Sequence, residues 1–172
     1  NNKNVGLVIK MNNPTPESKK KIQNVLDGYT NVYLIEGTLN RDQVNSLTKC
    51  VDVVVSLHRA EGFGLVLAEA MLLGTPTIAT NWSSNTEFMN KDVACMVDYK
   101  LITIEKDIPP FKAGNRWADA DLDQAAEYMR KLYEDKAFYE TIRDNAKKYA
   151  EDILGMEHAA GVIRERLKEI WS

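Results

Sequence analysis

Short apolar runs alternate with helical segments through the first half of the chain, and this alternation limits the possible folds more than any other feature. Val5–Ile9 and Val32–Ile35 are brief runs rich in β-branched residues, as in strands of a parallel sheet. Helical segments separate such runs, which implies βαβ units. The sequence therefore predicts an α/β protein with a Rossmann-like, doubly wound parallel sheet. The predicted strands are 5–9, 32–35, 51–57, 76–79 and 94–97, and the predicted helices between them are 17–26, 41–50 and 65–73, with one helical turn at 86–89.

The alternation stops after the fifth predicted strand. Residues 99–118 contain Pro109, Pro110, Gly114 and a lone Trp117, and they predict an irregular loop that is either functional or an insertion. From Asp119 to the end the apolar residues follow a helical period, which predicts a set of C-terminal helices. The last of these spans about 157–170.

Length and charge set the class of protein. A chain of 172 residues fits one domain, so we expect a single domain over 1–172. With 22 basic and 25 acidic residues, the net charge is −3, and the chain as a whole lacks the excess of basic residues typical of nucleic-acid-binding proteins. No apolar run approaches the roughly 18–20 residues of a transmembrane helix. The start, Asn1–Asn4, has neither a signal-peptide pattern nor an initiator Met, and we expect a piece cut from a longer chain.

The two cysteines and two histidines give no sign of a disulfide bond or a metal centre. Cys50 and Cys95 lie in apolar stretches without CxxC spacing, which favours buried, reduced thiols in a cytosolic protein over a disulfide. His58 and His158 are far apart in the sequence, and neither belongs to a cluster with metal-ligand spacing.

Glu69 is the one charged residue between Gly62 and Thr86. It lies in a predicted helix that is apolar on nearly every side, and such a helix is expected to be buried. A buried carboxylate costs several kcal/mol unless it is paired or hydrogen-bonded. Three interpretations fit: Glu69 caps the amides of a neighbouring loop, pairs with a cation, or faces a cleft and binds a polar ligand.

The segment Gly62-Phe63-Gly64 joins a predicted strand to this helix. In open parallel sheets, ligands bind beyond the carboxyl ends of the strands, and a helix start offers free amides to an anion. A phosphate on the amides of Phe63–Leu65 would place Glu69 about one turn into the helix, within reach of ribose hydroxyls. The pair of glycines is a weak signal alone, because its spacing differs from the dinucleotide fingerprint.

Three further polar residues precede the helix. Glu61 either binds hydroxyls of a sugar beyond the phosphates or is a solvated loop acid. Arg59 either contacts phosphate or pairs with Glu61. His58 is either a ligand contact or a structural histidine, and we favour the structural role.

The residues from Glu61 to Glu69 resemble the E-x7-E signature of retaining glycosyltransferases of the group 1 type, glycosyltransferase family 4, which have the GT-B fold. The resemblance extends to Cys50–Arg59 before the motif and to Gly74–Asn85 after it, and it covers roughly residues 5–98. Trp117–Asp121 and Met129-Arg130 resemble a bacterial polysaccharide-assembly branch of that family.

The resemblance implies the C-terminal, donor-binding half of a two-domain enzyme. Glu69 would bind the ribose of a nucleotide diphosphate sugar, Glu61 would contact the transferred sugar, and the base would lie near 37–39. Amides of Phe63–Leu65 would hold the distal phosphate, and the loop 80–85 would form the floor. The predicted site comprises Glu61 as catalytic residue and, as donor-binding residues, His58, Arg59, Gly62, Phe63, Gly64, Leu65, Glu69, Thr80, Asn81, Ser83 and Ser84.

The resemblance also implies partners and a location. The nucleotide sugar is a donor substrate, and neither a cofactor nor a metal is expected. The acceptor would be a saccharide or a lipid-linked sugar, at the inner face of the membrane in the cytoplasm. The family's acceptor half, and the Arg and Lys that neutralise the diphosphate, would precede the residues seen here. The helix from 157 then either crosses back to that missing half or packs as ordinary core.

Three other functions compete with a transferase. One is a sugar-nucleotide epimerase of the same fold, and another is a domain that binds nucleotide sugars without turnover. A redox dinucleotide enzyme is disfavoured, because Met11-Asn12-Asn13-Pro14 follows the first strand where a Gly-x-Gly-x-x-Gly run would be required.

Overall fold

The computed structural model describes residues 4–171, in two compact units divided in the sequence between Val44 and Asn45. Residues 1–3 of the expected domain, with most of the Asn1–Asn4 start, lie outside the described residues, as does Ser172. The expectation of one domain over the whole chain stays a prediction.

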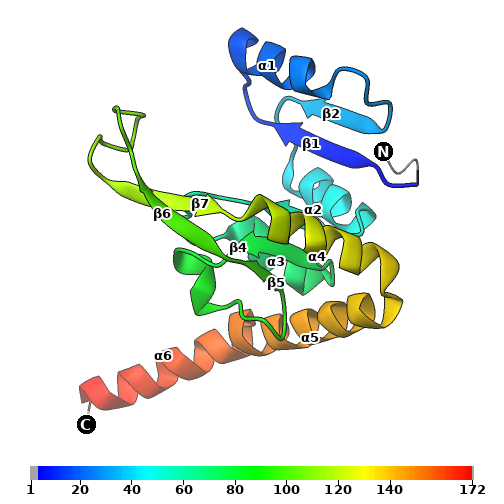
Figure 1. Cartoon of the computed structure of the whole chain (residues 1–172). Helices are drawn as coiled ribbons and strands as arrows, with labels where there is room; N and C mark the ends of the chain where they lie inside the picture. The colour runs from blue at the N-terminus through cyan, green and yellow to red at the C-terminus, as the bar shows by residue number, and fades with distance from the viewer. Residues whose placement is uncertain (1–3, 172) are drawn as a thin grey trace. The chain divides into compact units, whose positions relative to one another are not determined.

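The first unit contains a parallel βαβ arrangement (Figure 1). Strand β1 (Leu7–Met11) pairs in parallel with β2 (Val32–Glu36), and helix α1 (Pro16–Leu26) connects them. Helix α1 begins with proline, and its N-cap Thr15 accepts a hydrogen bond from the Ser18 amide at 3.2 Å. The parallel pairing confirms the first predicted βαβ unit.

Helix α2 (Arg41–Cys50) has the bounds that the sequence predicts. The Asn40 side chain accepts from the Gln43 amide, and the Gln43 side chain accepts from the Asn40 amide, both at 2.9 Å. This reciprocal capping satisfies two orphan donors at once, which explains why the helix begins where it does.

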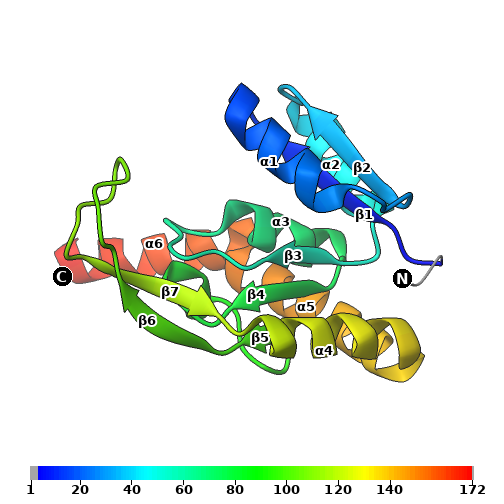
Figure 2. The same ribbon diagram turned by 45° about the horizontal axis from the view of Figure 1, so that its top comes forward.

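The second unit is built on a three-stranded parallel sheet (Figure 2). Its strands β3 (Val54–Ser56), β4 (Thr77–Thr80) and β5 (Cys95–Val97) lie in sequence order, and α3 (Leu65–Leu73) connects the first two. The five predicted strands therefore fall into two parallel sheets. Periodicity locates strands, but pairing depends on contacts between distant residues.

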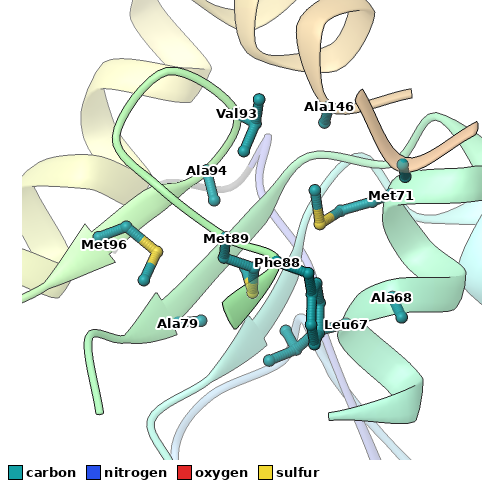
Figure 3. Packing of buried hydrophobic residues seen from close by; sticks show 11 residues of the cluster. Leu67, Ala68, Met71, Ala79, Phe88, Met89, Val93, Ala94, Met96 and Ala146 are labelled. Carbon is teal, nitrogen blue, oxygen red and sulfur yellow. The ribbon is translucent and has the colours of Figure 1, made fainter. Parts of the chain in front are cut away.

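Helices cover both faces of this sheet. Adjacent β4 residues point to opposite faces, so Ile78 packs toward α4 (Leu122–Glu134) while Ala79 packs toward α3 and α5 (Lys136–Leu154). Figure 3 shows this second cluster, in which side chains from α3, β4, β5 and α5 converge. Helices on both faces confirm the doubly wound α/β class.

Residues 99–118 correct one expectation. In place of an irregular loop, β6 (Tyr99–Thr103) and β7 (Arg116–Ala120) form an antiparallel hairpin, with Tyr99 opposite Ala120 and Thr103 opposite Arg116. The turn signals at Pro109, Pro110 and Gly114 mark only its tip (Figure 1). Cross-strand pairing between residues this far apart in sequence is not visible as a local pattern.

The remaining elements agree with the sequence to within a few residues. A short 3-10 helix η1 (Ser84–Glu87) replaces the expected turn at 86–89, and α6 (Met156–Trp171) follows α5. Asp135 ends α4 and caps α5, because its side chain accepts from the Phe138 amide at 2.9 Å. Within the described part of the chain, no helix has the length and hydropathy required to span a bilayer.

The cysteines differ from each other, which corrects the expectation that both are buried. Cys50, the last residue of α2, is exposed, and Cys95 in β5 is buried. Both are free thiols. Burial disfavours the thiolate and raises the pKa of Cys95 to about 12, against an ordinary value of 9.0.

This difference predicts selective thiol–disulfide exchange. Between pH 8 and 9, an aromatic disulfide reagent should modify Cys50 rapidly and leave Cys95 unmodified in the folded protein, because only an exposed thiolate reacts. Both thiols should react in denaturant. Mass spectrometry of the Cys50→Ser variant measures the modification of Cys95 alone, and the Cys95→Ser variant is the matched control. Fast modification of folded Cys50→Ser would contradict the burial of Cys95.

The packing of α3 predicts an unequal response to identical truncations. Leu67 is 1% exposed in the cluster of Figure 3, whereas Leu65 is 59% exposed. Leu67→Ala should lower the free energy of unfolding by about 2–5 kcal/mol, and Leu65→Ala by less than about 1 kcal/mol. Urea denaturation of both variants measures the difference, and equal losses would refute the packing of this helix.

Candidate functional site

The candidate site lies where the loop after β3 meets the loop after β4. The carbonyl of Glu61 accepts hydrogen bonds from the Ser83 hydroxyl at 2.7 Å and from the Ser84 hydroxyl at 3.0 Å. The Glu61 amide in turn donates to the Ser83 hydroxyl at 3.3 Å. Two predicted site residues, 22 and 23 positions further along, therefore hold the backbone of the predicted catalytic residue.

Ser83 holds this contact with an unusual backbone. Its φ of 79° and ψ of −160° belong to a region that residues with a side chain rarely adopt. Such a conformation costs about 1–3 kcal/mol, and surrounding contacts must impose it. Both bonds between Ser83 and Glu61 would be lost with glycine, so the serine hydroxyl explains why a side chain is present there.

His58 belongs to the framework of the two loops. Its Nε2 lies 2.9 Å from the Trp82 carbonyl and 3.1 Å from Asn85 Oδ1. Both of these atoms are acceptors, so Nε2 carries a proton and donates to them. Nδ1 lies 3.1 Å from the Ser56 hydroxyl, with which it shares a hydrogen bond. Both ring nitrogens have protein partners, as the structural role favoured from the sequence requires.

Asn85 links the loop contacts to the sheet, and it is absent from the predicted set of site residues. It is fully buried, and its Nδ2 donates to the Thr80 carbonyl at 3.1 Å while its Oδ1 accepts from His58. A buried asparagine must satisfy its polar atoms, so this pair of bonds fixes its orientation. The available signal was an asparagine soon after a predicted strand, which is also common in ordinary turns.

The start of α3 offers backbone amides. Its N-cap, Gly64, has a left-handed φ of 93° and supplies no side-chain cap. An added Cβ at Gly64 would lie 3.3 Å from Phe88 Cζ and 3.4 Å from Asn85 Cβ, so the left-handed conformation favours glycine and the packing leaves little room for a side chain. The close neighbours of Gly64 are therefore side chains of the protein, and an approach of phosphate to this glycine stays a prediction.

The carboxylate of Glu61 folds back onto the same turn. Its Oε1 accepts from the Gly62 amide at 3.0 Å and, more weakly, from the Phe63 amide at 3.5 Å. Phe63 is 44% exposed, and its ring packs on Phe88 with centroids 5.1 Å apart. The turn therefore already has a negative group at its first two amides.

Helix α3 is only partly buried, which corrects the expectation of burial on all sides. Leu65 and Val66 in its first turn are 59% and 55% exposed, while Leu67 and Ala68 are buried. Glu69 is half-buried one turn after Leu65 and lies on the same side of the helix. Burial begins only where the helix reaches the cluster that it shares with α5.

Arg59 takes a partner that the sequence did not indicate. Its Nη2 lies 2.9 Å from Asp119 Oδ1, and its guanidinium lies 4.9 Å from the centre of the Trp117 ring. Its carbonyl accepts from the Ala118 amide at 3.0 Å. These contacts join the loop after β3 to the hairpin, and Asp119 takes the place of Glu61 as the carboxylate partner of Arg59.

Two more predicted residues lie at the end of β4. Thr80 is fully buried, and its Oγ1 has no hydrogen-bond partner among the described residues. Its side chain therefore lies beneath the floor of the site rather than on it. The Asn81 amide donates to the Val97 carbonyl at 2.8 Å and holds the loop start against β5. Across residues 4–171, no group of three or more metal-ligating side chains is close enough to hold an ion.

Comparison with known proteins gives one family. The family model "Glycosyl transferases group 1" matches residues 2–149. No curated protein sequence matches the chain.

Solved structures share the fold at low identity. HepE from Anabaena, in complex with UDP and glucose, is 17% identical with a TM-score of 0.68, and the match covers 95% of this chain and 40% of HepE. Sucrose-phosphate synthase from Thermosynechococcus elongatus is 18% identical with a TM-score of 0.68, over 96% of this chain and 38% of the synthase. The C-terminal domain of a group 1 glycosyl transferase, LpcC from Francisella tularensis, is 19% identical with a TM-score of 0.63, over 83% of this chain and 66% of that domain. The chain thus spans about two fifths of the first two structures and shares their Rossmann-like half.

The bonds of Asn85 predict a buried polar contribution to stability. Asn85→Ala should lower the free energy of unfolding by about 1–3 kcal/mol, because it removes two buried hydrogen bonds, one to the Thr80 carbonyl and one to the His58 ring. Asn145→Ala is the matched control: this exposed asparagine also donates to a carbonyl, that of Asp92 at 3.1 Å. Its loss should be under about 0.5 kcal/mol. Similar losses in both variants would contradict the framework role of Asn85.

Proposed function

Because the chain belongs to the group 1 glycosyl transferases, we propose that it is the donor-binding half of a retaining glycosyltransferase. Its substrate would be a nucleotide diphosphate sugar, whose sugar is transferred to a saccharide or lipid-linked acceptor. Neighbours of the same fold support the class of donor, since HepE was crystallised with UDP and with UDP-glucose. The chain spans only part of these proteins, so the proposal concerns its share of the reaction.

One observation carries the proposal: the start of α3 has no side-chain cap, and the turn just before it holds the Glu61 carboxylate. The free amides and the helix dipole favour an anion at this point. Glu61 Oε1 already accepts from the amides of Gly62 and Phe63. A phosphate would therefore bind one step further along, at the amides of Gly64 and Leu65, which narrows the range 63–65 expected from the sequence.

The two glutamates would then have separate tasks. Glu69 follows Leu65 by one helical turn, so its carboxylate would accept hydrogen bonds from the ribose hydroxyls of a nucleotide whose phosphate lies on the Leu65 amide. Glu61, at the entrance of the turn, would contact the transferred sugar. Its backbone is fixed by Ser83 and Ser84, which suits a group that must be positioned accurately.

The chemistry would consist of positioning and charge stabilisation. The bond between the anomeric carbon and the distal phosphate oxygen breaks, and the oxygen of the acceptor hydroxyl forms a new bond on the same face of the sugar. The hydroxyl proton would pass to the leaving diphosphate. The amides at the start of α3 would stabilise the charge that grows on the leaving diphosphate. The donor is a substrate, and the proposal assigns no resident cofactor.

The acceptor half would precede this chain, and α6 would pack against it. No α6 residue is buried, and its exposed apolar residues include Val162 (57%), Ile163 (59%) and Trp171 (79%). An apolar surface of this kind marks a contact with another part of a protein. We place the activity in the cytoplasm, with lipid-linked acceptors reached at the inner membrane face.

The assignment of Glu69 predicts a loss of nucleotide affinity. Glu69→Gln should weaken UDP binding roughly tenfold to hundredfold, because hydrogen bonds from hydroxyls to a charged acceptor are lost. Glu127→Gln, an exposed helical glutamate on α4, should leave affinity unchanged. Titration calorimetry with UDP, GDP and ADP measures the effect and identifies the base. Equal affinity in the two variants would remove Glu69 from the site.

Glu61 should behave in the opposite way. Glu61→Gln removes a negative charge beside the proposed diphosphate, so UDP should bind as tightly as before or more tightly. Transfer by the complete protein should fall about a hundredfold or more, because a group near the reacting carbon is changed. Product analysis by NMR should show a retained anomeric configuration in the unmodified enzyme. An inverted product, or an altered nucleotide sugar formed without acceptor, would contradict a retaining transferase.

A further inference from the structure

The β6–β7 hairpin forms a cavity of about 610 Å³ that the proposed donor site does not use. Ligand pockets typically have volumes of about 300–1,000 Å³. The lining comes from both strands, from the chain just after β6, and from Arg59 in the loop after β3. Arg59 precedes Glu61 by two residues, so this hairpin cavity is joined through a short loop to the candidate site.

The walls of the hairpin cavity are mainly apolar. Trp117 and Ile102 lie opposite each other in the antiparallel register, and Ile108 lies beyond them toward the tip. The Phe111 ring meets Trp117 edge-on, with centroids 5.8 Å apart. An indole beside branched aliphatic side chains offers the flat apolar surface on which the C–H face of a sugar ring packs.

The rim is polar and close to electrical balance. Arg59 and Lys106 are positive and Glu105 is negative, while Asp119 pairs with the guanidinium of Arg59. These side chains supply several hydrogen-bond donors and acceptors without a strong net charge. That combination suits an uncharged ligand with many hydroxyl groups better than a phosphate or a nucleic acid.

The cavity is held open by contacts of its own. The Ala118 amide donates to the Arg59 carbonyl at 3.0 Å, which anchors β7. At the tip, Ile108 and Phe111 exchange backbone hydrogen bonds of 2.9 and 2.7 Å. A site fixed in this way loses little entropy when a ligand binds.

Trp117 also carries an unsatisfied polar atom. Its indole Nε1 is buried and has no hydrogen-bond partner among residues 4–171. A buried unpaired donor costs free energy, and few are found in native proteins. Because this atom is buried, a ligand in the cavity would meet the indole ring rather than its N–H.

We propose that the hairpin cavity is a saccharide-binding subsite, with the Trp117 indole as its platform and the rim side chains as its hydrogen-bond partners. Its occupant is a neutral sugar ring of the acceptor, held beside the donor site through the Arg59 loop. Naming the occupant as acceptor rests on the proposed transferase function. The binding of a sugar at Trp117 does not.

The test follows the three indole N–H signals of the chain in ¹H–¹⁵N spectra. Trp117→Phe assigns the Trp117 signal, and the probes are glucose, galactose, mannose, N-acetylglucosamine and maltose. At least one probe should shift the Trp117 signal in a saturable way and leave Trp171 on α6 unchanged. Lys106→Ala should weaken that binding several-fold, whereas Lys148→Ala, an exposed lysine on α5, should not.

The outcomes separate the two proposals. If UDP binds by calorimetry and no probe shifts the Trp117 signal, the subsite is wrong and the donor site stands. If a sugar binds at Trp117 while UDP does not bind, the subsite stands and the donor site is wrong. Sugar-induced shifts of backbone amides that persist unchanged in Lys106→Ala and Trp117→Ala would place the sugar elsewhere and overturn the subsite.

Discussion

The buried side chain of Asn85 supports both loops on which the candidate site depends. It donates to the Thr80 carbonyl at the end of β4 and accepts from His58, just after β3. Water cannot replace these partners in a fully buried position, so the two loops are fixed relative to each other. Ser83, next to this link, can then keep its strained backbone and hold the Glu61 carbonyl. The position of Glu61, just before α3, therefore depends on all of these contacts.

The sequence predicts most of the regular structure of this protein, because local signals determine it. The bounds of α2 and α3 agree with prediction, since α2 has a capping pair at its start and α3 ends at the left-handed Gly74. The apolar run 51–57 predicts a longer strand than β3, whose pairing with β4 covers only Val54–Ser56. Apolar sequence marks the potential to form a strand, whereas the partner strand decides its length.

Partners that lie far apart in sequence were beyond local prediction. Arg59 binds Asp119, 60 residues away, and the β6–β7 hairpin closes over a tip rich in proline and glycine. Each of these contacts depends on folding that brings distant segments together. Glu61, Gly64 and Glu69 lie in one short strand–turn–helix segment, so their proximity follows from local sequence, while their roles in binding stay predictions. The sequence predicts that the loop 80–85 forms the floor of the site, but it does not predict the hydrogen bonds from Ser83 and Ser84 to Glu61.

The central claim is that the amides at the start of α3 bind the phosphate of a nucleotide sugar beyond the carboxylate of Glu61. Titration of the ¹⁵N-labelled protein with UDP, followed by backbone amide shifts, tests this most directly. The amides of Gly64 and Leu65 should show the largest saturable changes, with smaller ones at Gly62 and Phe63. Saturable binding that leaves Gly64 and Leu65 unchanged, or no binding by the complete protein, would contradict it.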